Sequence, residues 1–172
     1  MITNKTINYA IYDRSAGKPT KVADTTSVKL PDLEYLTETV KGAGIMGEID
    51  MPSPGQLGSM VTEIAIKNTN KSTVKLFAPK TQDIEVRWVK DALDPKSGAL
   101  VSVPMKAIIR GIPKNTSLGT VETNATNDGN LALETTYIKL LENGETLYEI
   151  DKLNSVLIIA GHDYMKDIRE AL

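Results

Sequence analysis

The fold class is decided by one stretch, residues 129–154, which reads GNLALETTYIKLLENGETLYEIDKLN. At its centre, Asn143-Gly144 tolerates positive φ at both positions and so closes a two-residue turn. The Thr, Tyr, Ile and Leu residues on either side suit a pleated, half-buried surface. We therefore predict a long antiparallel hairpin within an all-β core.

Alternation of apolar and polar residues predicts further strands. In residues 82–93 the side chains of Ile84, Val86 and Trp88 face one way and those of Asp83, Glu85 and Arg87 the other. We expect additional strands at residues 6–13, 22–30, 60–67 and 100–112. A short central helix is expected between residues 70 and 78, and a C-terminal helix over 162–172. The fold class is mainly β: an antiparallel β-sandwich or partly open barrel with these two helices.

Two segments are expected to lie outside this core. Residues 35–50 predict a protruding hairpin with a Gly-rich apex, because its apolar residues do not form one clean face in the sequence. Residues 113–128 are rich in Thr, Asn and Gly and predict a flexible loop, and Pro52-Ser53-Pro54-Gly55 predicts a second loop. A length of 172 residues indicates a single domain over 1–172.

Composition excludes several function classes. Lys and Arg number 20 against 22 Asp and Glu, giving a net charge of −2, which disfavours tight binding of DNA through its phosphates. The absence of cysteine excludes disulfides and thiolate chemistry. The N-terminus lacks the apolar segment of a signal peptide, and no apolar run is long enough for a membrane helix. We expect a protein of the cytoplasm that does not enter membranes.

No motif predicts catalysis, a cofactor or a metal. His162 is the only histidine, and no Gly-x-Ser-x-Gly motif accompanies it. The run from Gly42 to Gly47 matches Gly-x-Gly-x-x-Gly, but β-like sequence flanks it on both sides, so a turn is the better interpretation. Glu145, Glu149 and Asp151 are expected on one strand face; without an aromatic platform, a solvated acidic face is favoured over a glycosidase pair. Trp88 is expected in the core.

Taken in order, these motifs give a family resemblance. The chain resembles the major tail tube proteins of contractile-tailed bacteriophages, a family found also in R-type bacteriocins. The resemblance is carried by KGAGIMG at 41–47, TYIKL at 136–140, NGE at 143–145 with YEID at 148–151, and a terminal helix containing Asp163 and Arg169. The order of these motifs extends through most of the chain.

The resemblance implies a structural protein rather than an enzyme. Members of this family form rings of six subunits whose inner strands join into one ring-shaped β-barrel. The rings stack head to tail into a tube inside a contractile sheath, and DNA passes through the bore without specific binding. The implied partners are further copies of the chain, the tail sheath protein, the baseplate and the tape-measure protein. Assembly would occur in the host cytoplasm, and the final location would be the virion.

The resemblance also assigns roles to surfaces. The strands at 82–93 and 100–112 and the hairpin 129–153 are candidates for the barrel wall. An acidic surface lining the lumen or ring, which would repel DNA phosphates, is predicted from Asp83, Glu85, Glu145, Glu149 and Asp151. The hairpin apex is predicted to contact a neighbouring subunit through Val40, Lys41, Gly42, Ala43, Gly44, Ile45 and Met46.

Two other interpretations stay open at this point. One is a sheet-rich module that binds a receptor or sugar; such modules normally display exposed aromatic residues or a metal loop, and aromatics are only 5% here. The other is a ring protein of a secretion system with the same tube architecture. The sequence does not separate phage, bacteriocin and secretion-system particles.

Overall fold

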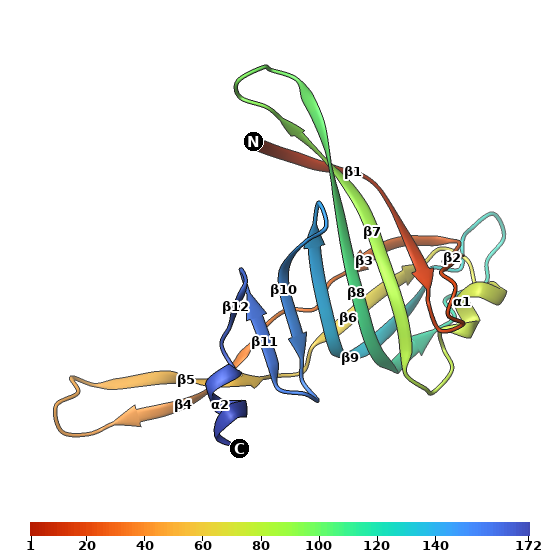
Figure 1. The fold of residues 1–172 in the computed structure, drawn as a ribbon. Helices are drawn as coiled ribbons and strands as arrows, with labels where there is room; N and C mark the ends of the chain where they lie inside the picture. Colours follow the sequence, from red (N-terminus) through yellow and green to blue (C-terminus); the bar gives the residue numbers. More distant parts are fainter.

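The computed structural model describes residues 1–172 as an antiparallel β structure with two short helices (Figure 1). Neither helix has the length and apolar character needed to cross a membrane. The helices are α1 (Lys71–Lys75) and α2 (Lys166–Ala171). The strands are β1 (Ile2–Asp13), β2 (Thr20–Val22), β3 (Thr25–Lys29), β4 (Tyr35–Lys41), β5 (Glu48–Leu57), β6 (Val61–Ile66), β7 (Gln82–Leu93), β8 (Leu100–Ser117), β9 (Gly129–Glu142), β10 (Glu145–Asp151), β11 (Val156–Ile159) and β12 (His162–Asp163).

Ten of the strands form one sheet, and β9 is its branch point. The main order is β12-β11-β10-β9-β8-β7-β1-β2. On the edge of β9 away from β8, residues 129–134 pair with β6, and residues 137–142 pair with β10. Strand β3 then pairs with the other edge of β6. The sheet of a single chain is open, so a ring-shaped barrel is not formed within one subunit.

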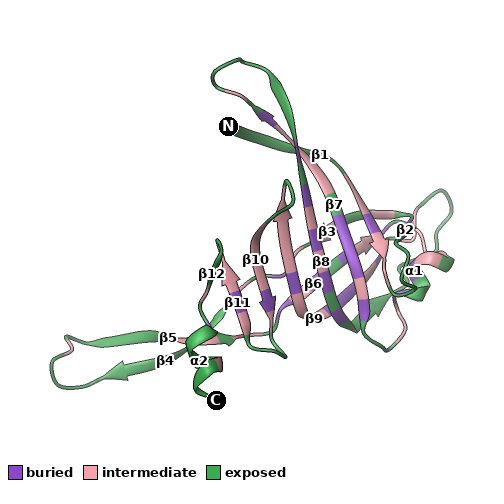
Figure 2. Cartoon of the chain, viewed as in Figure 1, coloured by how far each residue is buried: buried purple, intermediate pink, exposed green.

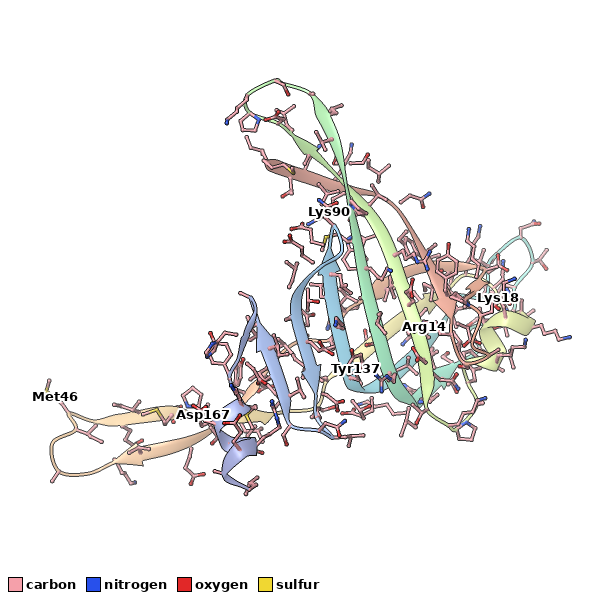
Figure 3. All side chains as sticks on the ribbon, in the orientation of Figure 1. Arg14, Lys18, Met46, Lys90, Tyr137 and Asp167 are labelled. Carbon is pink, nitrogen blue, oxygen red and sulfur yellow. The ribbon has the colours of Figure 1, made fainter.

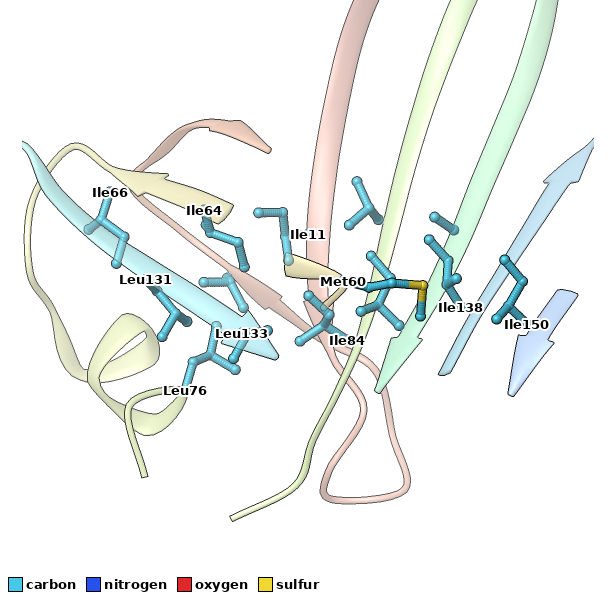
Figure 4. Close-up of a cluster of buried hydrophobic side chains, with 14 of the residues drawn as sticks. Ile11, Met60, Ile64, Ile66, Leu76, Ile84, Leu131, Leu133, Ile138 and Ile150 are labelled. Carbon is cyan, nitrogen blue, oxygen red and sulfur yellow. The ribbon is translucent and has the colours of Figure 1, made fainter. Parts of the chain in front are cut away.

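This branching folds the sheet over a single main core. Strands β3 and β6 cross behind β7 and β8 (Figure 1), and apolar side chains from both layers meet between them. Figure 4 shows Ile64 of β6 and Leu131 of β9 in the same cluster as Ile11 of β1 and Ile84 of β7. Burial of one Ile or Leu side chain contributes about 1.5–3 kcal/mol, so this cluster is the main stabilising feature.

The central hairpin predicted from residues 129–154 is confirmed. Asn143 and Gly144 have φ values of 50° and 85°, and the turn places Glu142 opposite Glu145. The pairing of β9 with β10 is not regular throughout, because the register shifts between Thr146 and Tyr148. A shift of this kind inserts one extra residue in one strand and reverses the face of the residues beyond it.

Strands β4 and β5 form a separate two-stranded sheet that projects from the body of the protein (Figures 1 and 2). Every residue of β4 is exposed. The sequence predicted that the apolar residues of this hairpin lack a common face, and the strand register contradicts this. Val40 lies opposite Ile49, and Met51 lies opposite Glu38. Val40, Ile49 and Met51 therefore share one face of the ribbon.

Three segment boundaries also differ from the sequence prediction. The expected loop Pro52–Gly55 belongs to β5. This strand has one unpaired edge, and proline, which lacks an N–H group, is tolerated at positions that face such an edge. Strand β8 continues to Ser117, paired with β9, so only residues 118–128 form the connecting loop. The central helix is confirmed in a shorter form, with Asn70 and Thr73 forming a reciprocal cap.

The expected helix over 162–172 starts later than predicted. Ala160 and Gly161, with φ values of 50° and 82°, form a second tight turn that returns the chain along β11 as β12. His162 and Asp163 are therefore in a strand, and the helix covers only Lys166–Ala171. The Asp163 carboxylate accepts a hydrogen bond from the Met165 N–H and forms an ion pair with Arg169. This contact fixes the helix against the end of the sheet.

Candidate functional surfaces

One face of the main sheet is lined with charged side chains. Directly opposite residues point to the same face, and the registers align Glu85 with Ile108, Ile108 with Lys139, and Lys139 with Glu149. We define the charged face by its central polar members: Tyr12, Arg14, Asp83, Glu85, Arg87, Lys106, Arg110, Tyr137, Lys139, Glu149 and Asp151. Figure 3 labels Arg14 and Tyr137 on this sheet.

The centre of the charged face is built around Glu85. Its side chain is only 7% exposed, although it points away from the apolar core. Three cations surround its carboxylate: Arg14 Nε at 3.9 Å, Lys106 Nζ at 4.0 Å, and Arg87, whose Nε–H donates a hydrogen bond to Oε1. The Arg87 guanidinium also lies 4.6 Å from the centre of the Tyr12 ring, which covers this group from the β1 side.

A second group of contacts lies further along the same face. The Glu149 carboxylate accepts a hydrogen bond from the Tyr137 hydroxyl at 2.8 Å and pairs with Lys139 Nζ at 3.1 Å. The Arg110 guanidinium lies 4.1 Å from the centre of the Tyr137 ring. Burial, together with the hydrogen bond to Glu149, raises the pKa of Tyr137 to about 12.

The predicted surface was acidic, but the structure shows that it also carries basic residues. It places Asp83, Glu85, Glu149 and Asp151 on one face, but five basic residues share that face: Arg14, Arg87, Lys106, Arg110 and Lys139. Asp83 lies 3.8 Å from Arg14, and the Asp151 carboxylate accepts hydrogen bonds from the backbone N–H groups of residues 153 and 154. The same registers add Lys21, opposite Tyr12, and Asp91 and Asp163, so cations and anions are present in similar numbers and the face is close to neutral rather than acidic.

The structure also separates Glu145 from the other predicted acids. Glu145 lies opposite Glu142, whereas Glu149 lies opposite Lys139. Residues 139 and 142 are three apart in β9, so their side chains point to opposite faces of the sheet. The register shift in β10 places Glu145 on the opposite face, and the alternating sequence does not indicate this shift. Arg87 was visible by its alternation with Asp83 and Glu85, but Lys106, Arg110 and Lys139 required the strand registers.

The β4–β5 hairpin is the second candidate surface. Its two faces differ in chemistry, with Lys41 and Glu48 3.6 Å apart and the Thr39 hydroxyl donating to Asp50 at 2.8 Å on the polar side. The other face carries Val40, Ile49 and Met51, which are 38%, 47% and 51% exposed, together with the single acid Glu38 opposite Met51. The predicted contact residues 42–46 form the apex, and the Met46 side chain lies fully exposed at its tip (Figure 3).

An apolar groove of about 390 Å³ opens where β1 and β7 meet β3. It is lined by Tyr9, Val28, Leu30 and Trp88, among others. Trp88 packs against the main core as predicted, but one side of its ring belongs to this groove. The groove lies on the core side of the sheet, away from the charged face.

The remaining motifs, His162 and the glycines from 42 to 47, lie in a short strand and in a hairpin turn. His162 lies in β12, where its ring packs edge-on against Tyr164 with the ring centres 4.6 Å apart. The glycines from 42 to 47 connect two antiparallel strands, whereas the dinucleotide motif requires a strand followed by a helix. No group of three or more Asp, Glu or His side chains is placed to hold a metal ion.

Comparison with known proteins assigns the family. A family model described as "phage tail tube protein FII" matches residues 16–172, almost the whole chain. The chain belongs to the phage tail tube protein FII family. The tail tube resemblance proposed from the sequence motifs is therefore confirmed at the level of the family. A search of curated proteins gives no match.

Chains from solved contractile injection systems share this fold. One chain from the sheath/tube terminator of an extracellular contractile injection system, PVC, has a TM-score of 0.55 at 12% identity, covering 80% of this chain and 96% of that one. A chain from the PVC sheath-tube complex has a TM-score of 0.52 at 12% identity, covering 77% and 87%. At this identity the likeness concerns the fold.

Proposed function

We propose that this tail tube protein builds the inner tube of a contractile tail from stacked rings of six subunits, through which DNA is ejected. The observation that carries this proposal is the β4–β5 hairpin, a two-stranded ribbon with a solvent-exposed, largely apolar face. A lone two-stranded hairpin is marginally stable in water, so an exposed apolar face of this kind needs a partner surface.

The open sheet supports assembly by the same reasoning. Strands β2, β3 and β12 end the sheet with unpaired edges. Unpaired edges invite pairing with other chains, and closure of subunits into a ring removes them. Contacts within such a ring are head-to-tail and close by rotation, whereas contacts between rings extend the tube. Each subunit would contribute residues 1–172 as a single domain.

We assign the charged face to the lumen and the hairpin to contacts with neighbouring subunits. A near-neutral polar surface offers DNA no gain from counterion release, so a duplex could slide along it. The tail sheath protein, the baseplate and the tape-measure protein are the proposed partners, in keeping with the sheath-tube complex in which a protein of this fold was solved. Assembly would take place in the host cytoplasm and end in the virion.

Negative-stain electron microscopy of the purified protein at high concentration tests this proposal. Hollow tubes or six-fold rings are the expected result. A protein that stays monomeric by sedimentation at every concentration, and that binds a sugar or peptide in the groove beside Trp88, would instead support a sheet-rich binding module. Replacing Trp88 by alanine should abolish ligand binding in that second case only, and Trp88→Phe is the matched conservative variant.

A further inference from the structure

Glu85 is the only charged residue that is buried in this protein. It lies on the sheet face that points away from the main core, so apolar packing does not account for its burial. The side chains that cover it are those of the charged face itself, among them Arg87 and Lys106. Burying a carboxylate is costly unless several partners satisfy it, which indicates that the arrangement is specific.

The cations around Glu85 come from separate parts of the chain. Arg14 follows β1, Arg87 belongs to β7 and Lys106 to β8. Their side chains are 34%, 47% and 44% exposed, so all three remain within reach of a phosphate group in solution. We call Glu85 with these three residues the Glu85 cluster. It concentrates three positive charges on one carboxylate at the middle of the charged face.

We propose that Glu85 is the residue that prevents this face from binding double-stranded DNA. A phosphate that approached Arg14, Arg87 or Lys106 would have to replace the carboxylate that each already contacts. Binding would then exchange one anion for another, with little of the counterion release that drives DNA association. The Glu85 cluster thus places three cations at the middle of the face without creating a site that binds DNA. Its role in DNA passage rests on the proposed tube function.

Replacement of Glu85 by glutamine tests the proposal directly. Binding of a short fluorescent duplex is measured by anisotropy at low salt, at a protein concentration where sedimentation shows no assembly. Glu85→Gln should bind DNA at least about tenfold more tightly than the wild-type protein. The slope of log K against log salt should approach about −2 to −3, as expected when up to three phosphates are neutralised.

Glu63→Gln provides a control with the same change in net charge. Glu63 is exposed on β6, in the other layer, and forms no ion pair. This variant should bind DNA as weakly as the wild-type protein. The double variant Glu85→Gln/Arg87→Gln, which restores the net charge of the face, should lose most of the gained affinity.

Several results would overturn the proposal. A folded Glu85→Gln protein with the DNA affinity of Glu63→Gln would do so, as would a wild-type protein that binds DNA equally tightly. If Glu85→Gln does not fold, Glu85→Ala removes the same carboxylate without leaving a buried amide, and no gain in DNA affinity in that variant would also overturn it. The tube function is judged separately, because a wild-type protein that forms no tubes leaves the binding result unchanged.

Discussion

The sulfur atom of Met165 occupies the space that a Cβ atom on Gly55 would need. An ideal Cβ at Gly55 would lie 2.0 Å from Met165 Sδ and 2.6 Å from its Cε. Gly55 is in β5 at φ +67°, at the root of the β4–β5 hairpin, and Met165 is buried just before α2. The C-terminal segment of the chain is therefore packed directly onto the base of the projecting hairpin.

Substitution of Gly55 by alanine should destabilise the protein more than the backbone conformation alone requires. The left-handed φ costs about 1–2 kcal/mol for a residue with a Cβ, and displacement of a buried Met165 adds about 1–3 kcal/mol. Gly98→Ala is a matched control, because Gly98 has φ +69° and no atom lies within 4 Å of an added Cβ. Chemical denaturation should show the larger loss for Gly55→Ala; equal losses would mean that Met165 moves aside freely.

The apolar face of the hairpin should be required for tube formation but not for folding. Val40→Lys places a charge beside Ile49 on the face proposed to contact a neighbour. We expect the melting temperature to change by no more than a few degrees, while electron microscopy shows no tubes. Thr37→Lys, on the opposite face of the same strand, should still assemble. Tubes from Val40→Lys would show that this face stays in solvent.

Two buried threonine hydroxyls at the branch of the sheet should contribute to stability as a pair. Thr62 Oγ1 and Thr135 Oγ1 are 2.7 Å apart, and both residues are completely buried. Thr62→Val or Thr135→Val leaves the other hydroxyl without this partner, at a cost of about 1–3 kcal/mol. The double variant should lose less stability than the sum of the singles in a double-mutant cycle. Strict additivity would show that the pair contributes nothing.

Tyr137 should be a late-titrating tyrosine. Burial and the hydrogen bond to Glu149 raise its pKa to about 12, above the ordinary value of 10.0. Because the folded pKa is the higher one, the stability that this shift contributes is fully present below pH 10 and is lost as pH rises toward 12. Ultraviolet titration of the folded protein should show a tyrosine phase near pH 12 that is missing in Tyr137→Phe. An unchanged titration curve would contradict the raised pKa of Tyr137.

Turn and helix residues in the sequence were enough to predict the elements that depend only on neighbouring residues. Asn143-Gly144 identified the central hairpin, and the short helix lies within the predicted residues 70–78. The second tight turn at Ala160-Gly161 was missed because alanine rarely adopts positive φ, so the following residues were taken for helix.

Features that depend on pairing between distant strands were not predictable in this way. The division of β9 between β6 and β10 depends on partners far apart in the chain, and nothing in residues 129–142 marks it. The register shift in β10 moved Glu145 off the charged face, and the cations around Glu85 come from separate strands. The alternating pattern of any single strand was therefore not enough to predict the net charge of the candidate surface.

The branch at β9 also determines the order in which the chain can fold during its synthesis. Strand β6 leaves the ribosome early and can pair with β3, but its other edge stays open until residues 129–134 have emerged. During that interval Ile64 and Ile66 lack the partner strand that completes their layer. Non-local pairing of this kind slows folding and exposes strand edges to other chains. When many ribosomes translate this chain close together, the open edge of β6 in one nascent chain could therefore pair with another chain before any ring forms.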